Sequence, residues 1–292
     1  MSSFDRFVAG NAAGLFVLLW STGFIGAKFG LPHAEPFTFL FLRFALTLVI
    51  LVPLVLLHRP QLGMRGREYV HLMGSGLLLH GVYLGGIFTA IKHGLPAGLT
   101  ALIVGLQPLL TSLAAPLLFG ERTSALHWLG IVIGFGGIYL ILGAAPDTPQ
   151  GASALAAAFV ALFGITAGTL YQKRYCTQHD LLAVAVFQYV PTLALFGFGA
   201  LLFETRQVDW SGQFVAALLW LVCALSIGAI LLLAYLIKHG EASKVTSLFY
   251  LVPPATAVEA WLLFDEPLGA AKVLGIALVA LGVYLVMKQR KS

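Results

Sequence analysis

The sequence of 292 residues predicts an all-α integral membrane protein in which ten transmembrane helices form two inverted-topology repeats of five helices each. Three observations lead to this fold class. The composition leaves too few charged residues to cover a surface exposed to water. Ten apolar segments are each long enough to cross a lipid bilayer, and the second half of the chain repeats the first at a nearly constant spacing.

The composition places most of the surface against lipid. Hydrophobic residues make up 59% of the chain and charged residues only 10%, whereas a soluble domain carries about 25% charged residues. The net charge of +5 does not indicate a nucleic-acid partner, because the basic residues lie in short gaps between apolar segments and form no basic stripe. Cys176 and Cys223 have no neighbouring metal ligands, so we expect no metal or other cofactor.

Ten segments satisfy the requirement of about 20 mostly apolar residues for a membrane-crossing helix. They are residues 7–29, 36–57, 69–91, 97–119, 125–143, 152–172, 181–203, 213–237, 245–264 and 268–287. We expect the first to be retained rather than cleaved as a signal peptide, because no small-residue cleavage site with polar sequence follows it. A linker at 145–149 divides the chain into two domains, 7–145 and 151–287.

The basic residues predict the orientation of the chain in the membrane. If the N-terminus is cytoplasmic, twelve of the 17 Lys and Arg residues lie on the cytoplasmic side, four lie on the other side, and Arg43 lies within a span. Lys and Arg are enriched in cytoplasmic loops. The bias therefore predicts that both termini are cytoplasmic, and it supports an even number of spans.

The second half of the chain matches the first at an offset of 145 residues. The matched pairs include Lys28 with Lys173, Glu35 with Asp180, Arg43 with Gln188, Pro108 with Pro253, Glu121 with Glu266, Gly130 with Gly275 and Gly137 with Gly282. Ile-Lys-His-Gly at 91–94 recurs at 237–240, one residue out of that register. A collinear series of this length indicates an internal duplication.

Five spans per half imply that the second half enters the membrane from the opposite face. Inverted-topology repeats are characteristic of secondary transporters, because two similar halves can exchange conformations and move access from one side to the other. The chain contains no Gly-x-x-x-x-Gly-Lys-Ser/Thr motif, so transport driven by a gradient is expected rather than ATP hydrolysis through a P-loop.

Several motifs resemble those of the EamA-type drug/metabolite transporter superfamily. They are Leu-Leu-Trp-Ser-Thr-Gly at 18–23, Pro108, Leu-Phe-Gly-Glu at 118–121, Pro253 and Leu-Phe-Asp-Glu-Pro at 263–267. Within that superfamily the chain is similar to bacterial amino-acid exporters, including the YddG-type aromatic amino-acid exporters. The resemblance implies a multi-pass protein of the bacterial cytoplasmic (inner) membrane with cytoplasmic termini. It also implies a central cavity lined mainly by spans one, three, four, six, eight and nine.

Polar and aromatic residues at membrane depth are candidates for lining such a cavity, since they normally face the interior of a bundle. We select Trp20, His80, Tyr83, Gln107 and Tyr250 as substrate-binding residues. The alternative is that these residues only form hydrogen bonds between helices, each worth about 0.6 kcal/mol on average.

Pro108 and Pro253 lie near the middle of their spans and are candidate hinges. Proline removes a backbone N–H and leaves the carbonyl four residues earlier, at Val104 or Phe249, without its helical partner. Those carbonyls could accept a hydrogen bond from a substrate ammonium group. The alternative is that neighbouring groups satisfy them, as is common in membrane helices.

Four further candidate residues carry charge. For Arg43 we favour a structural ion pair or a clamp on backbone carbonyls. Glu259 lies nine residues after Tyr250, which is half a turn around the helix, and near the outer end of its span, so a role in proton coupling is disfavoured. Glu121 and Glu266 end equivalent helices, and we interpret them as loop anchors.

These features predict a secondary transporter, not an enzyme, that exports small amphipathic metabolites by alternating access. Neutral and aromatic amino acids are the expected substrates, because an uncharged, aromatic-lined cavity suits a zwitterion better than a sugar phosphate. The alternatives are another small metabolite or drug, a passive channel, or a membrane-embedded lipid enzyme. The expected partners are the small-molecule substrate and the lipid bilayer, and the oligomeric state is left open.

The basic-loop bias generates a test of orientation. Cysteines introduced at Thr148 and Gly269 should react with a membrane-impermeant reagent added to intact cells, and cysteines at Gly66 and Ser292 should not. Labelling is measured relative to the parent chain. Reaction of the cysteine at Gly66 from outside would contradict the predicted orientation.

Overall fold

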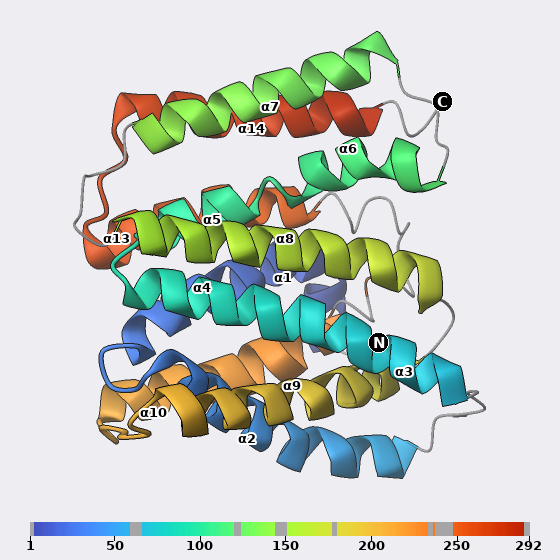
Figure 1. Cartoon of the computed structure of the whole chain (residues 1–292), viewed down its shortest axis with the longest axis vertical. Coiled ribbons are helices and arrows are strands. Elements are labelled where there is room, and N and C mark those ends of the chain that lie inside the picture. The colour runs from blue at the N-terminus through green and yellow to red at the C-terminus, as the bar shows by residue number, and fades with distance from the viewer. Residues whose placement is uncertain are drawn as a thin grey trace.

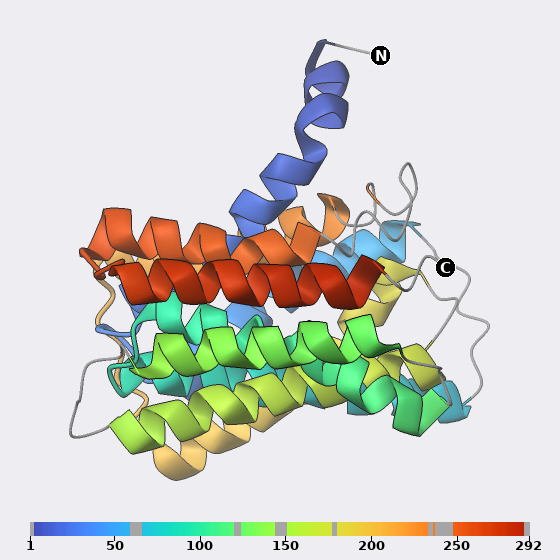
Figure 2. The same cartoon turned by 90° about the horizontal axis from the view of Figure 1, so that it is seen from above.

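The computed structural model describes residues 3–58, 66–119, 124–143, 151–176, 180–232, 236 and 248–288. Within these residues the chain is almost entirely helical, and the only β pairing is an isolated antiparallel bridge between Ala34 and Val208. The helices run side by side in one bundle, from which the first part of α1 projects (Figures 1 and 2). Helices satisfy their backbone hydrogen bonds internally, as a lipid environment requires.

The helical elements follow the expected segments closely. They are α1 (Ser3–Gly30), α2 (Pro36–His58), α3 (Gly66–Gly76), η1 (Leu77–Val82), α4 (Tyr83–Lys92), α5 (Ala97–Val104), α6 (Gln107–Phe119), α7 (Ala125–Gly143), α8 (Gly151–Tyr175), α9 (Leu181–Phe203), α10 (Gly212–Leu219), η2 (Trp220–Ala229), η3 (Phe249–Leu251), α13 (Val252–Phe264) and α14 (Ala270–Lys288). Of the η segments, η1 and η2 are π-helical and η3 is a 3₁₀ turn.

Eight helical regions among the described residues are long and apolar enough to cross a membrane. They correspond to the first eight segments expected from the sequence. The last two expected segments, 245–264 and 268–287, contain the shorter apolar helices Phe249–Phe264 and Ala270–Val286. The all-helical membrane architecture is therefore confirmed, and the full number of ten spans stays a prediction.

The two π-helical segments interrupt the third and eighth spans at equivalent places. The offset of 146 residues that relates 91–94 to 237–240 carries 77–82, the whole of η1, onto 223–228, which lies within η2. A π-helical turn inside an α-helix is rare and occurs frequently at functional sites. Both halves of the chain therefore carry the same local irregularity, one in each wall of the cavity described below.

Pro108 and Pro253 do not kink continuous helices, and this corrects the sequence expectation. Pro108 is the second residue of α6, after a break at residues 105–106, and Pro253 is the second residue of α13, after the 3₁₀ turn η3. Proline is well tolerated in the first turn of a helix, where its missing N–H has no helical partner in any case. The two breaks lie against each other, because a Cβ atom on Gly105 would come within 2.5 Å of the Cγ atom of Pro253.

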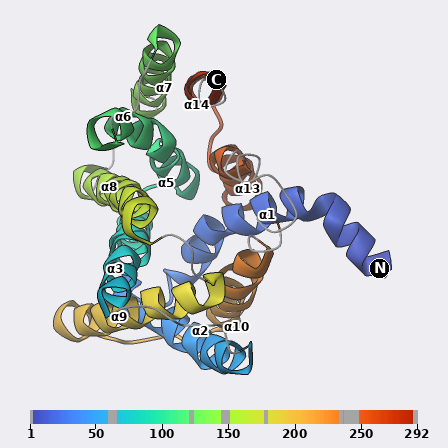
Figure 3. The ribbon, with the colours of Figure 1, turned by 90° about the vertical axis from the view of Figure 1, so that its right-hand side faces the viewer.

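Helices α7 and α14 pack closely and lie together at one side of the bundle (Figures 1 and 3). A Cβ atom on Gly130 would lie 2.7 Å from the carbonyl oxygen of Gly282, and one on Gly137 would lie 2.7 Å from the carbonyl oxygen of Gly275. The residue numbers rise along one helix as they fall along the other, so the pair is antiparallel. Small residues allow membrane helices to approach at this distance.

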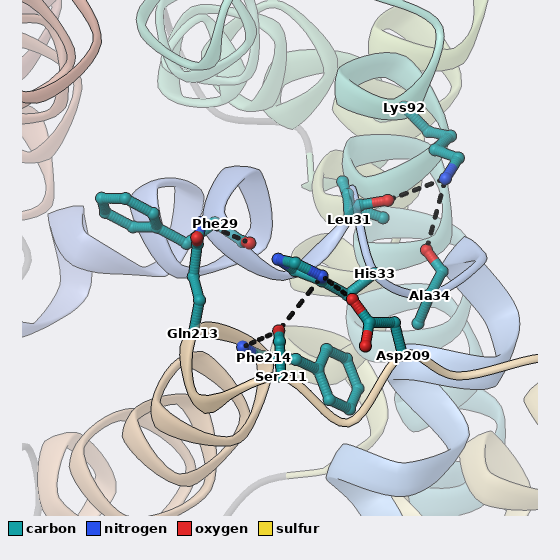
Figure 4. A network of polar contacts seen from close by, with 9 residues as sticks. All are labelled: Phe29, Leu31, His33, Ala34, Lys92, Asp209, Ser211, Gln213 and Phe214. Carbon is teal, nitrogen blue, oxygen red and sulfur yellow. Dashed lines mark hydrogen bonds and ion pairs between the residues drawn. The ribbon is translucent and has the colours of Figure 1, made fainter.

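At the end of the bundle where α1 meets α2, polar groups tie the connections together (Figure 4). His33 Nδ1 lies 2.8 Å from Asp209 Oδ2 and 3.1 Å from Ser211 Oγ. Lys92 Nζ donates to the carbonyl oxygen of Leu31 at 2.7 Å. Nearby, a hydrogen bond from the Thr205 hydroxyl holds the pKa of the Glu35 carboxyl below its usual value.

The close approach of α7 and α14 predicts a position-specific loss of stability. Gly130→Val should force the helices apart, because its neighbour is backbone and cannot move aside, and overpacking of this kind costs about 1–3 kcal/mol. Gly136→Val introduces the same side chain into the same helix, where nothing lies within 4 Å. Thermal unfolding in detergent should show a lower Tm for Gly130→Val alone, and equal effects would contradict the packing argument.

Candidate functional site

A cavity of about 300 Å³ lies between the two halves of the chain. Its size is at the lower end of the range of small-molecule pockets. Its wall is formed by Trp20, Gly23, Phe24, Arg43, Phe44, Leu79, His80, Tyr83, Leu84, Ile87, Phe88, Ile165, Thr169, Gln172, Leu181, Val184, Ala185, Gln188, Tyr189, Leu225, Ser226, Ile230 and Phe249. Spans one, three, six, eight and nine contribute, as the resemblance implies. Spans two and seven also contribute, and none of the described side chains of span four lines the cavity.

Three of the five residues predicted to bind substrate line this cavity. Trp20 reaches it from α1, His80 from η1 and Tyr83 from the start of α4. The prediction for the third span was that His80 and Tyr83 share one face, and the structure places them together. His80 lies in the π-helical segment η1, and Tyr83 directly follows it at the start of α4.

Gln107 does not line the cavity, so the structure corrects this part of the prediction. Its Nε2 atom lies 3.2 Å from Thr111 Oγ1 and 3.3 Å from Thr169 Oγ1. The Gln107 amide therefore bonds α6 to α8, as the interhelical alternative proposed. Thr169 does line the cavity, which places Gln107 directly behind its wall.

Tyr250 also lies outside the wall, and its neighbour Phe249 takes the expected place. Tyr250 packs instead against an apolar cluster that includes Leu99, Leu102 and Leu106. The prediction assumed one continuous α-helix through the ninth span. The 3₁₀ turn η3 has a different residue spacing, so it changes which side chain faces the cavity.

Aromatic rings form one part of the wall. The rings of Phe16, Trp20 and Phe249 pack in a triangle with centroid separations of 5.0 to 5.2 Å. Elsewhere in the wall Tyr189 makes edge contacts with Phe44 and His80, each with centroids 4.9 Å apart. Tilted and edge-on pairs at these distances are favourable and hold the rings in fixed orientations.

Two polar pairs cross the cavity region between the halves. Arg43 Nε donates to Ser226 Oγ at 3.1 Å, and His80 Nε2 lies 3.2 Å from Gln188 Oε1. Gln188 Nε2 donates to Ser75 Oγ at 3.0 Å. Because the Gln188 oxygen can only accept, the His80 proton is assigned to Nε2 from this network.

These two pairs occupy equivalent positions in the internal repeat. Arg43 matches Gln188 at an offset of 145, and His80 matches Ser226 at the offset of 146 that holds in the third span. The repeat therefore carries the Arg43–Ser226 bond onto the Gln188–His80 bond. Gln188 and Ser226 line the cavity but were not among the residues predicted to bind substrate, although the match of Arg43 with Gln188 was a signal that pointed to this pair.

Arg43 differs from the sequence expectation. Only 6% of its surface is exposed, and the one hydrogen bond from its side chain to a described residue runs from Nε to Ser226 Oγ. No carboxylate of the described residues lies within ion-pair distance of it, and it binds no backbone carbonyl there. The guanidinium instead lines the cavity, which is therefore not the uncharged site that the sequence suggested.

Glu259 does not line the cavity, in agreement with the helical-angle argument. Its Oε1 atom lies 2.6 Å from Ser21 Oγ on α1, while Oε2 is buried and has no hydrogen-bond partner among the described residues. The Thr256 hydroxyl donates to the Ser21 carbonyl at 3.2 Å. Glu259 thus faces α1 rather than the membrane interface that the sequence suggested.

Glu266 anchors the start of α5. Its Oε1 atom accepts hydrogen bonds from Lys28 Nζ at 2.6 Å and from Ala97 N at 2.8 Å, and Oε2 accepts from Gly98 N at 3.0 Å. A carboxylate at this position satisfies free N–H groups and complements the positive end of the helix dipole. The anchoring role predicted for Glu266 fits this geometry, and Glu121 lies outside the described residues.

The sequence and the fold were compared with those of known proteins. A family model described as "EamA-like transporter family" matches twice, at residues 11–143 and 152–288. A protein of Bacillus subtilis named "Uncharacterized transporter YvbV" is 26% identical over 280 residues, covering 94% of this chain and 90% of the relative. A protein of Escherichia coli named a probable amino-acid metabolite efflux pump is 25% identical over 291 residues, covering 94% and 93%.

A solved crystal structure shares the fold, with a TM-score of 0.68 at 23% sequence identity, covering 96% of this chain and 98% of its own. The two family matches together span nearly all of the chain and meet at the linker between the two halves. They agree with the motifs at 18–23, 118–121 and 263–267. The chain therefore belongs to the EamA-like transporter family.

Proposed function

We propose that this transporter exports neutral and aromatic amino acids, or close metabolites of them, across the bacterial inner membrane by alternating access. The observation that carries the proposal is the composition of the cavity wall, in which rings such as Trp20 and Phe249 surround polar groups drawn from both halves. Rings suit an apolar side chain, and the polar groups suit its zwitterionic end. The Escherichia coli relative named an amino-acid metabolite efflux pump supports this choice of substrate class.

The contact between α7 and α14 supports an inverted repeat of residues 7–145 and 151–287. The repeat carries Gly130 onto Gly275 and Gly137 onto Gly282, so the contact of Gly130 with Gly282 is carried onto the contact of Gly275 with Gly137. A contact that the repeat carries onto itself in this way is expected where a two-fold axis relates the two halves. Equivalent helices that pack antiparallel enter the membrane from opposite faces, as in an inverted repeat.

Equivalent breaks in the two halves support alternating access. Each half contains a π-helical segment, η1 or η2, and an interrupted helix that begins again at Pro108 or Pro253. Discontinuous helices near the midplane are typical of secondary transporters, where they form the binding site and absorb the change in shape. Only the second-half break reaches the cavity, through Phe249.

The substrate class can be tested with purified protein in liposomes. Tryptophan, methionine and threonine should be taken up saturably and should show counterflow, which separates a carrier from a passive channel. A dicarboxylate such as glutamate and a sugar phosphate should be carried poorly, since one buried cation cannot match two or more negative charges. Faster uptake of glutamate or sugar phosphate than of the three neutral amino acids would refute the proposal.

The cavity wall predicts which variants impair transport. Trp20→Ala, His80→Ala and Tyr83→Ala should each raise the KM for tryptophan about tenfold, the effect of losing roughly 1.4 kcal/mol of binding. Gln107→Ala and Tyr250→Ala should have smaller effects, and Glu259→Gln should leave the KM unchanged, because these side chains lie outside the wall. Uptake is compared at equal amounts of folded protein. Loss of transport in Glu259→Gln with normal transport in the three wall variants would show that the wrong surface was chosen.

The helix breaks predict an effect on turnover. Pro108→Ala restores an N–H that can bond to the Val104 carbonyl, so α5 and α6 could join into one stiffer helix. Pro253→Ala should act in the same way on the ninth span. Both variants should lower the maximal transport rate severalfold more than they weaken binding, as measured by single-turnover uptake and by equilibrium binding. Full turnover in both would argue against hinges at these positions.

A further inference from the structure

Arg43 is a buried cation without a protein counter-ion in the described residues. Its side chain lies in the cavity wall, 6% of its surface is exposed, and its guanidinium lies 5.9 Å from the Phe44 ring centroid. A guanidinium has five N–H donors. The donor on Nε is used by Ser226, and the four on the two Nη atoms have no acceptor among the described residues.

Burial of the unpaired Arg43 guanidinium costs free energy when no substrate is bound. Removing a charge from water costs several kcal/mol unless a partner of opposite charge and suitable geometry replaces the lost hydration. Among the described residues the ion pairs join Glu266 with Lys28 and Asp209 with His33, and no carboxylate is paired with Arg43. A negatively charged partner can therefore reach the Arg43 guanidinium from the cavity.

We propose that Arg43 is the carboxylate receptor of the transport site. Its two Nη groups bind the carboxylate of the substrate, while Ser226 holds Nε and thereby fixes the plane of the guanidinium. Planar guanidinium groups match carboxylates through two parallel hydrogen bonds, which gives geometric specificity as well as binding energy. This inference rests on the proposed function and adds to it the group that selects for an acid.

The internal repeat shows why the carboxylate binds in one orientation. The counterpart of Arg43 in the second half is Gln188, which is uncharged, and its amide is already bonded to His80 and Ser75. The second half therefore offers no equivalent receptor. A substrate bound through its carboxylate at α2 leaves its side chain to the apolar remainder of the wall, which includes Trp20 and Phe249.

This assignment makes the site selective against amines. A cationic drug, an amine or an amino-acid amide brings no negative charge to Arg43, and a cation is also repelled by it. Aromatic rings alone would bind tryptophan and tryptamine about equally. Discrimination between these two ligands therefore reports on the carboxylate contact and not on the rings.

The experiment measures equilibrium binding to purified protein in detergent. The ligands are tryptophan, tryptophanamide, tryptamine and indole-3-propionate, which share one ring and differ in charge. The wild type should bind the two carboxylates at least about tenfold more tightly than the two amines. Arg43→Gln should abolish this preference by weakening only the carboxylates, and Arg43→Lys should retain part of it, because the charge stays and the second hydrogen bond is lost.

Phe249→Leu serves as the matched control. It removes a ring from the wall and keeps the charge, so it should weaken all four ligands by a similar factor. Equal weakening of all ligands by Arg43→Gln would overturn the proposal and show that Arg43 only supports the wall. If Arg43→Gln fails to fold, the wild-type preference decides, because equal binding of tryptophan and tryptamine would overturn the proposal by itself.

The same ligands separate this proposal from the proposed function. If indole-3-propionate binds in an Arg43-dependent manner but no amino acid is bound or transported, the carboxylate receptor stands and the amino-acid substrate is wrong. If amino acids are transported without any preference over their amides, the substrate class stands and the role of Arg43 is wrong.

Discussion

Lipid supplies no hydrogen bonds, and this constraint determines where the polar side chains of the bundle lie. Among the described residues, several polar contacts at membrane depth join a helix of the first half to a helix of the second. They are Ser21–Glu259, Thr22–Trp220, Arg43–Ser226, His71–Tyr171, Ser75–Gln188, His80–Gln188 and Gln107–Thr169. Each such bond contributes about 0.6 kcal/mol on average. The set therefore aligns the two halves through individually weak bonds, as the proposed alternating access requires.

The internal repeat explains the symmetry of this interface, and Arg43 shows where the symmetry ends. The π-helical segments, the helix breaks before Pro108 and Pro253, and the α7–α14 contact all recur in both halves. The cavity keeps the same pairing, but Arg43 in the first half is matched by Gln188 in the second. A scaffold with two-fold symmetry thus encloses a cavity whose charge is on one side only. On the proposed mechanism, the symmetric features would allow the motion and the asymmetric charge would select the substrate.

The sequence predicted the features that depend on average properties and failed where local geometry decides. Lipid-facing composition, segment length and the repeat predicted the helical architecture, and the motifs predicted the family. The predicted shared face of His80 and Tyr83 and the choice of Trp20 agree with the cavity wall. Gln107 and Tyr250 were misplaced because helix breaks reset the pitch beside them. The environment of Arg43 could not be predicted either, since a single sequence does not show which charges meet in space. The repeat match with an uncharged Gln188 was the one available hint that Arg43 has no structural ion pair.

Alternating access exchanges the conformations of the two halves, so it also exchanges the surroundings of equivalent residues. In this structure Gln188 is enclosed by His80 and Ser75. The counterparts of these two residues in the second half are Ser226 and, at the same offset of 146, Leu221. After the exchange Arg43 would have the Ser226 hydroxyl beside it, and Leu221 would add no second polar group for its Nη atoms. Closing the cavity around an unpaired guanidinium removes its remaining hydration, which costs several kcal/mol, whereas closing it around a bound carboxylate does not. On the proposal that Arg43 is the receptor, the loaded carrier crosses more readily than the empty one, and the return step is fastest when another carboxylate occupies the site. The buried cation would then favour exchange of one acid for another over net one-way flow.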